Sequence, residues 1–213
     1  MNSANVQNKI PSLLLRTLLS QVDQMLGHRS LIRLLRRAGL GEFSDRFPPQ
    51  DTTPSISVEA WSRLLADVHD TFGAEAAQAV FVQAGHLAAA EMRRQRAPQL
   101  AITGTALRLL PVDRRIRLVL EAFAEQSEEA FGTPHYLYEG PDGFQVEIPN
   151  CPHCAEISRR SSAENRGLDR PFCHLAAATL AETLEWALGR RCLVEEIACI
   201  ATGQPTCRFG FSL

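Results

Sequence analysis

The spacing of apolar residues changes part-way along this chain of 213 residues, and that change constrains the fold more than any other feature. In the first part, leucine, valine and alanine recur every three or four residues, which is the period of an amphipathic helix. This pattern predicts helices over 11–26, 30–38, 57–71, 74–96 and 113–130. Beyond residue 132, short runs alternate between apolar and polar positions, so the chain is predicted to change from helices to strands.

The second part of the chain is predicted to form a sheet with one packed helix. Strands are expected over 135–138, 143–148, 192–199 and 207–213. The first two are joined by a turn at 140–143, while 155–170 forms a loop or a short surface helix. Pro171 opens a helix over 172–188. Helices followed by a sheet that carries one helix indicate an α+β protein.

A polar, proline-containing connection over 47–54 separates the first helices from the rest of the chain. The chain length and its 45% hydrophobic content suit one or two domains. We therefore expect an N-terminal helical extension over 1–55 and a second domain over 56–213.

Charge and hydropathy argue against several classes of partner. The net charge of −2 and the pI near 6.3 argue against a basic surface for nucleic acid. No run of about 18 uncharged apolar residues is present, so no membrane span is expected. The apolar run 13–19 contains Arg16 and precedes no small-residue cleavage site, so it predicts a buried helix face and not a signal peptide. We expect a cytoplasmic protein with no nucleic-acid or membrane partner.

All six cysteines follow residue 150, and in a reducing cytosol such a cluster more often binds metal or carries out redox chemistry than forms disulfides. Cys173 is expected in the first turn of a helix, where a thiolate is favoured. Cys199 ends one predicted strand and Cys207 begins the next, so a hairpin would place them side by side. These three thiolates and one carboxylate could form the closed tetrahedral shell of a structural zinc ion.

Two adjacent glutamates compete for the fourth position of that shell. In a regular strand Glu195 shares a face with Cys199, whereas Glu196 points the other way. The strand pattern by itself therefore favours Glu195. Glu196 becomes the ligand only if the strand breaks or bulges near Ala198.

Cys151 and Cys154 form a Cys-x-x-Cys motif, which has several physical uses. The pair could be structural, lining the core or a pocket, or it could be half of a metal site or a redox pair. A four-ligand site built on it would have to borrow Cys173, Cys192 or His174. Cys192, at the start of a predicted strand, is expected to be a core residue.

Four segments of the tail resemble the vinyl-4-reductase domain family, and they read CPHC at 151–154, PFCHL at 171–175, EEIACIATG at 195–203 and CRF at 207–209. That family is named for a protein implicated in reducing the 4-vinyl group of bacteriochlorophyll precursors, and it includes the sensor domains of phenol- and xylene-responsive activators. The resemblance implies an α+β fold in which an antiparallel sheet and helices enclose a ligand cavity. The wider fold group includes subunits of vesicle-transport complexes and haem-based nitric oxide sensors.

The resemblance also implies a zinc site. In the phenol-sensor branch, zinc is held by a cysteine, a Glu-x-x-Cys pair and a further cysteine, which match Cys173, Glu196, Cys199 and Cys207. The match therefore selects Glu196 over Glu195. The phenol-binding histidine and tryptophan of that branch have no secure counterpart here, so no pocket residue is transferred.

The function we expect first is binding. A hydrophobic small molecule of aromatic or tetrapyrrole-like character would occupy a cavity that a structural zinc ion braces. His153, Tyr136 and Tyr138 lie near the cysteines in the sequence and are candidate contacts to the ligand. The two tyrosines could equally face solvent from a strand.

Two other functions remain as alternatives. One is an enzyme, a vinyl reductase acting on a bacteriochlorophyll precursor. The sequence has no dinucleotide fingerprint and no flavin motif to supply the electrons, so binding is the stronger hypothesis. The other is a dimeric interaction or scaffold module, with the helices over 11–38 and 57–71 at its interface, and we expect a homodimer.

Overall fold

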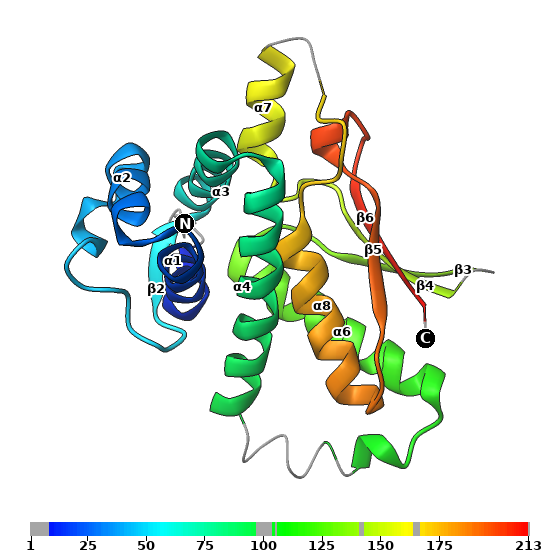
Figure 1. Cartoon of the computed structure of the whole chain (residues 1–213). Coiled ribbons are helices and arrows are strands. Elements are labelled where there is room, and N and C mark those ends of the chain that lie inside the picture. Colours follow the sequence, from blue (N-terminus) through cyan, green and yellow to red (C-terminus); the bar gives the residue numbers. More distant parts are fainter. Residues whose placement is uncertain (1–8, 97–103, 105, 141–142, 164–166, 213) are drawn as a thin grey trace, which may run out of the picture.

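The computed structural model describes residues 9–96, 104, 106–140, 143–163 and 167–212 (Figure 1). Its α-helices are α1 (Ser12–Leu26), α2 (His28–Ala38), α3 (Val58–Phe72), α4 (Ala74–Gln95), α6 (Val112–Phe131), α7 (Ala155–Ala163) and α8 (His174–Leu188). Its strands are β1 (Lys9–Pro11), β2 (Pro54–Ser57), β3 (Tyr136–Gly140), β4 (Gly143–Ile148), β5 (Leu193–Ala198) and β6 (Cys207–Ser212). Two short 3-10 helices complete the described chain, η1 (Gly41–Phe43) and η2 (Ile200–Thr202).

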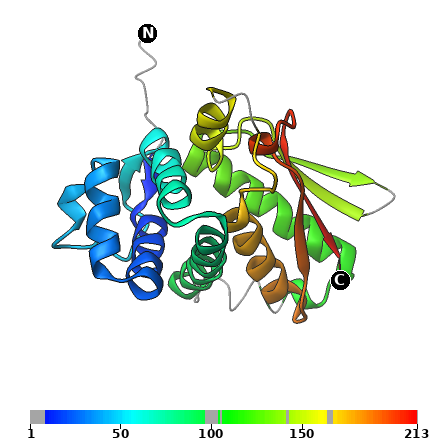
Figure 2. The ribbon, with the colours of Figure 1, turned by 45° about the horizontal axis from the view of Figure 1, so that its top comes forward.

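The larger sheet has four antiparallel strands in the order β3-β4-β6-β5. Strand β4 alternates exposed and buried positions, and Phe144, Val146 and Ile148 face the interior. Helices α8 and α6 pack together on the inner side of this sheet, and α4 lies beyond α8 (Figure 1). Figure 2 shows α1 and α2 on the side of α4 that faces away from the sheet. The protein is therefore α+β, which confirms the predicted fold class.

Most of the predicted elements are present. The helices end at glycines with positive φ, such as Gly39, Gly132 and Gly189, as C-terminal caps require. Ser57 caps α3 by accepting a hydrogen bond from the backbone N–H of Ala60 at 3.2 Å. The predicted turn between β3 and β4 includes Pro141 and Asp142, which lie outside the described residues.

The paired strands β1 and β2 were not predicted from the sequence. They are only three and four residues long, too short for alternation to be detected. They bring residues 9–11 beside 54–57 and so close the N-terminal helices onto α3. One cluster of buried side chains runs from Ile10 to Phe209, so α1 and α2 contribute to the same core as the sheet. The division into domains at residue 56 stays a prediction.

Helices α4 and α8 cross at close range, and Gly85 permits this approach. A Cβ atom at Gly85 would lie 2.5 Å from the carbonyl oxygen of Leu175 and 2.8 Å from the Cβ of Ala178. The hydroxyl of Thr179 also lies 3.4 Å from the Gly85 carbonyl. The residue without a side chain thus sets how near the two long helices can come.

Among the described residues, no helix is both long enough and apolar enough to cross a bilayer.

Candidate metal centre and adjoining cavities

Five cysteines from four separate stretches of chain meet at one end of the sheet, near α7 and η2 (Figure 1). Cys151 and Cys154 lie on the turn between β4 and α7, and Cys173 precedes the first residue of α8. Cys199 follows β5, and Cys207 begins β6. All five are at most 1% exposed, and all are free thiols. The cluster is therefore part of the core and inaccessible to bulk water.

The sulfur atoms are in mutual contact. The Sγ atoms of Cys151 and Cys173 are 3.4 Å apart, those of Cys154 and Cys207 3.3 Å apart, and those of Cys173 and Cys207 3.7 Å apart. The backbone N–H of Ile200 donates to the Cys207 sulfur at 3.4 Å. Such an N–H donor stabilises a thiolate in a buried setting.

A bulge in β5 decides between the two adjacent glutamates. The pairing of β5 with β6 shifts register between Glu196 and Ala198, so Ile197 is extra in the ladder. This shift places Glu196 and Cys199 on the same side, toward α8, and leaves Glu195 exposed. One oxygen of Glu196 accepts from the backbone N–H of Cys173 at 2.8 Å. The break near Ala198 that the sequence required for Glu196 is therefore present.

The second oxygen of Glu196, Oε1, is buried and has no hydrogen-bond partner among the described residues. Burial, and then the nearby Cys199 and Cys207, raises the pKa of Glu196 to about 11. The thiols of Cys154 and Cys173 lower the pKa of Cys199 to about 6. An ionised carboxylate and thiolate at this distance from each other need a cation beside them. A metal ion fits this requirement.

Two overlapping groups of four residues have their ligand atoms within 4.8 Å of one another. The first is the group expected from the sequence, Cys173, Glu196, Cys199 and Cys207. The second consists of Cys151, Cys154, Cys173 and Cys207. Thiolate-rich sets of this size suit zinc and other thiophilic ions, so the cluster could hold a metal. Cys192, which is buried elsewhere, belongs to neither group.

A largely apolar cavity of about 230 Å³ lies between α4, α6 and α8, adjoining the cluster. Ala88 and Ala89 of α4, Phe131 of α6, and Leu175 and Ala176 of α8 are among its walls. Small side chains on α4 and α8 leave this space where the helices diverge from the close crossing at Gly85.

His153 connects the cysteine cluster to this cavity. It lies between the two cysteines of the Cys-x-x-Cys motif, is 5% exposed and lines the cavity. The indole Nε1 of Trp61 donates to its Nδ1 at 3.3 Å, and Phe131 packs edge-on at 5.1 Å between ring centroids. Burial lowers the pKa of His153 to about 4, so the ring is neutral at pH 7 and carries its proton on Nε2.

The two predicted tyrosines do not join His153. Tyr136 and Tyr138 lie on β3 with exposed fractions of 47% and 48%, and neither lines the cavity. Their role in ligand binding stays a prediction. His135, immediately before β3, lines the cavity instead, and burial lowers its pKa. Sequence reasoning missed His135 because a single histidine at a strand start carries no distinguishing pattern.

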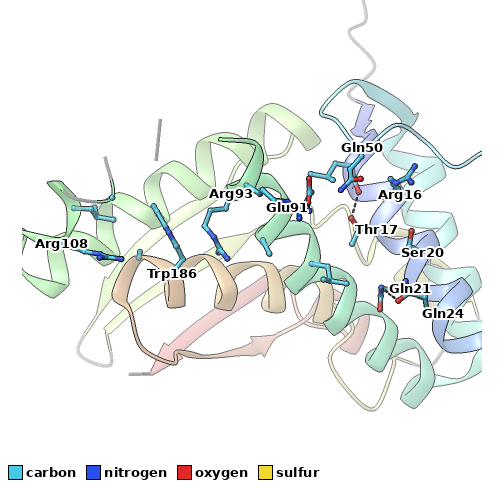
Figure 3. A pocket seen from close by; sticks show the side chains of 17 residues that line it. Arg16, Thr17, Ser20, Gln21, Gln24, Gln50, Glu91, Arg93, Arg108 and Trp186 are labelled. Carbon is cyan, nitrogen blue, oxygen red and sulfur yellow. Dashed lines mark hydrogen bonds and ion pairs between the residues drawn. The ribbon is translucent and has the colours of Figure 1, made fainter. Parts of the chain in front are cut away.

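A wider and more polar cavity, of about 850 Å³, lies between α1 and α4 (Figure 3). Arg16, Arg93, Arg94 and Arg108 line it, and Glu91 is the acidic residue in its wall. Leu13, Arg93 and Trp186 line both cavities, so the two adjoin each other. Sequence patterns do not indicate this cavity, because its walls come from three helices and the segment 104–108.

Known proteins resemble the chain in both sequence and fold. The vinyl-4-reductase domain matches residues 144–213. The 23 kDa chain of bacteriochlorophyll synthase from Cereibacter sphaeroides is 28% identical over 162 residues, which are 76% of this chain and 71% of that protein.

The solved structures that resemble this one include an H-NOX protein from S. oneidensis in its Fe(II)NO ligation state. It aligns over 96% of this chain and 99% of its own, with a TM-score of 0.57 and 10% identity. A mutant of the same protein in its Fe(II) state has a TM-score of 0.56. These structures share the fold. The match over 144–213, which contains every cysteine of the cluster, shows that this chain belongs to the vinyl-4-reductase domain family.

Proposed function

We propose that the chain is a binding, carrier or sensor module for a ring-shaped apolar molecule that bears acidic groups. The observation that carries the proposal is the junction of an apolar cavity with an arginine-lined one, at Leu13, Arg93 and Trp186. Binding sites for small molecules are mostly apolar with a few polar groups that fix orientation.

The size of the apolar cavity limits what it holds alone. A cavity of about 150 Å³ accommodates benzene, so the space of about 230 Å³ suits one or two aromatic rings. A larger macrocycle would place one edge there and its remainder in the wider cavity. The neutral His153 supplies a polar contact at the end nearest the cysteines.

The wider cavity favours an anion. Arg93 pairs with Glu182 at 2.9 Å, and Arg94 pairs with Glu91. Arg16 donates to the carbonyl oxygen of Pro48 and packs over Phe47. With four arginines and one glutamate in the wall, the cavity remains positive after these pairings, which suits a carboxylate.

A tetrapyrrole with carboxylate side chains combines these properties. The name of the relative from Cereibacter sphaeroides, a chain of bacteriochlorophyll synthase, supports a tetrapyrrole over other ring systems. Binding is favoured over vinyl reduction because a four-ligand metal shell leaves no open position for a reaction.

We assign a structural zinc ion to Cys173, Glu196, Cys199 and Cys207. Their ligand atoms lie within 4.8 Å of one another, and the unpartnered Oε1 of Glu196 provides the oxygen ligand. Such an ion would join the start of α8 to the β5–β6 hairpin and so brace the wall of the apolar cavity. Expression in a reducing cytoplasm would keep these thiols available.

Titration of the purified chain with protoporphyrin IX tests the ligand class. We expect saturable binding with one site per chain, followed by the change in porphyrin absorbance. Ala89→Leu fills the apolar cavity and should weaken binding at least tenfold, whereas Ala79→Leu, an exposed position of the same helix, should not. Equal affinities of the two variants would contradict the assignment of this cavity.

Arg108→Gln tests the anion contact, and Arg114→Gln, an exposed arginine outside both cavities, is its control. We expect only Arg108→Gln to weaken porphyrin binding, and we expect neither variant to affect naphthalene, which has no acidic group. A homodimer stays a prediction, and light scattering of the purified chain would test it.

A further inference from the structure

The buried cluster offers more ligand atoms than one tetrahedral ion can use. Five sulfurs and one free carboxylate oxygen are present, and a tetrahedral ion takes four ligands. The two groups of four overlap only at Cys173 and Cys207. An ion in either group alone would leave two buried ligands of the other without an ion.

We propose that the cluster holds two zinc ions at once, with the sulfurs of Cys173 and Cys207 bridging them. One ion has Glu196 and Cys199 as its other ligands, and it is the ion of the proposed function. The second ion has Cys151 and Cys154. The proposal rests on the metal part of the proposed function and is independent of the organic ligand.

The distances between sulfur atoms fit this arrangement. Zinc–sulfur bonds of about 2.3 Å place the ligands of a regular tetrahedron about 3.8 Å apart. The shared pair, Cys173 and Cys207, is separated by 3.7 Å, which matches an edge common to two tetrahedra. The contacts that join this pair to Cys151 and Cys154 are 3.4 and 3.3 Å, within reach of the same geometry after a small expansion.

Each half of the cluster has its own need for an ion. Without an ion beside Glu196, its buried Oε1 has no partner among the described residues. Without an ion beside Cys151 and Cys154, the contacts within 4.0 Å of the Cys154 sulfur are Cys207 at 3.3 Å and the Cys151 carbonyl at 3.9 Å, which are weak partners. Full ionisation would give six negative charges, of which one divalent ion balances two and two ions balance four. Two ions therefore leave the smaller uncompensated buried charge.

The two ions would also divide the structural work. The ion at Glu196 and Cys199 ties α8 to the β5–β6 hairpin. The ion at Cys151 and Cys154 ties the β4–α7 turn to the same two bridging sulfurs, and this turn positions His153 in the cavity wall. Cys154 immediately precedes α7, where a helix N-terminus stabilises its thiolate.

Metal analysis of the full chain, expressed with zinc and purified without chelator, tests the proposal directly. We expect two zinc ions per chain and neither iron nor acid-labile sulfide. The double variant Cys151→Ser/Cys154→Ser should keep one ion, and Cys192→Ser, a buried cysteine outside the cluster, should keep two. A single ion in the unmodified chain that the double variant retains would overturn the second ion and leave the proposed function intact. No bound metal, or iron with sulfide, would overturn both.

A second measurement needs no substitution and so does not depend on how the variants fold. The chain is loaded with the NMR-active isotope of cadmium, which accepts the same thiolate ligands as zinc. Two resonances that split one another through the bridging sulfurs are expected. One resonance, or two without mutual splitting, would overturn the bridged arrangement.

Discussion

The two ends of α8 belong to different kinds of site. At its N-terminal end, Cys173 lies in a cluster whose members are few, buried and specified by atom type. Toward its C-terminal end, Trp186 lines two cavities whose walls consist of many side chains, most of them replaceable by others of similar size. A metal site therefore depends on each of its ligands, whereas a cavity depends on the sum of its walls. Substitutions should be severe at the first end and graded at the second.

The largest effect is expected at a bridging sulfur. Cys207→Ser removes a ligand from both groups, and since metal binding and folding are coupled in such sites, it should abolish metal binding and lower the free energy of unfolding by more than about 4 kcal/mol. Metal analysis and chemical denaturation measure the two losses. Cys192→Ser is the control, and a loss as large as in Cys207→Ser would mean that the cluster does not hold the metal.

The choice between the adjacent glutamates gives the next effect. Glu196→Ala removes the oxygen ligand and should weaken zinc binding at least about 100-fold, which is about 2.7 kcal/mol. Glu195→Ala changes an exposed residue one position away and should leave zinc affinity unchanged. Competition with a chromogenic chelator measures both affinities. If Glu195→Ala proved the more harmful, the bulge in β5 would not have the role assigned to it.

At the close crossing of α4 and α8, Gly85→Ala should cost about 1–3 kcal/mol of unfolding free energy. Its new methyl group would meet the backbone of Leu175, so the helices must separate and the cavity between them must change shape. Porphyrin affinity should change while the metal content stays constant. Gly41→Ala, where no atom lies within 4 Å of the new Cβ, serves as the control. A simultaneous loss of metal would show that the two ends of α8 are not separable.

The smallest effect concerns pH at the cavity end. Burial lowers the pKa of His135 in the folded protein below its ordinary value near 6.5. The stability linked to the neutral ring is therefore complete above pH 6.5 and is lost as the pH falls through the lowered pKa. The melting temperature of His135→Gln should fall less between pH 7 and 5 than that of the unmodified chain. His28→Gln, an exposed histidine on α2, should behave like the unmodified chain. Identical pH profiles for all three proteins would exclude His135 as a source of acid sensitivity.

The metal end was largely readable from the sequence. Cysteine and glutamate are uncommon in a buried core without a partner, so their spacing and the family resemblance were enough to identify Cys173, Cys199 and Cys207 as candidate ligands. Strand alternation alone favoured Glu195, and this preference was wrong about which carboxylate joins the cluster. A one-residue bulge reverses the side on which a glutamate lies, and no local residue pattern announces it.

The cavity end was much less readable. An alanine such as Ala89 has the same local signature whether it lies against a neighbouring helix or against an open space. His135 and the arginines of the wider cavity likewise show no periodic pattern. The half-exposed Tyr136 and Tyr138 illustrate the same difficulty, because nearness in sequence to the cysteines did not bring them to the cavity.

The sequence by itself determined the order of helices and strands, the reduced cysteine cluster and the chemistry of its ligands, because these depend on local periodicity and on residue type. Only the tertiary structure decided that Cys151 and Cys154 meet Cys173 and Cys207, which glutamate faces them and where α4 and α8 leave room between them. Those outcomes depend on strand register and on how closely helices approach, and both are set by contacts between residues far apart in the chain.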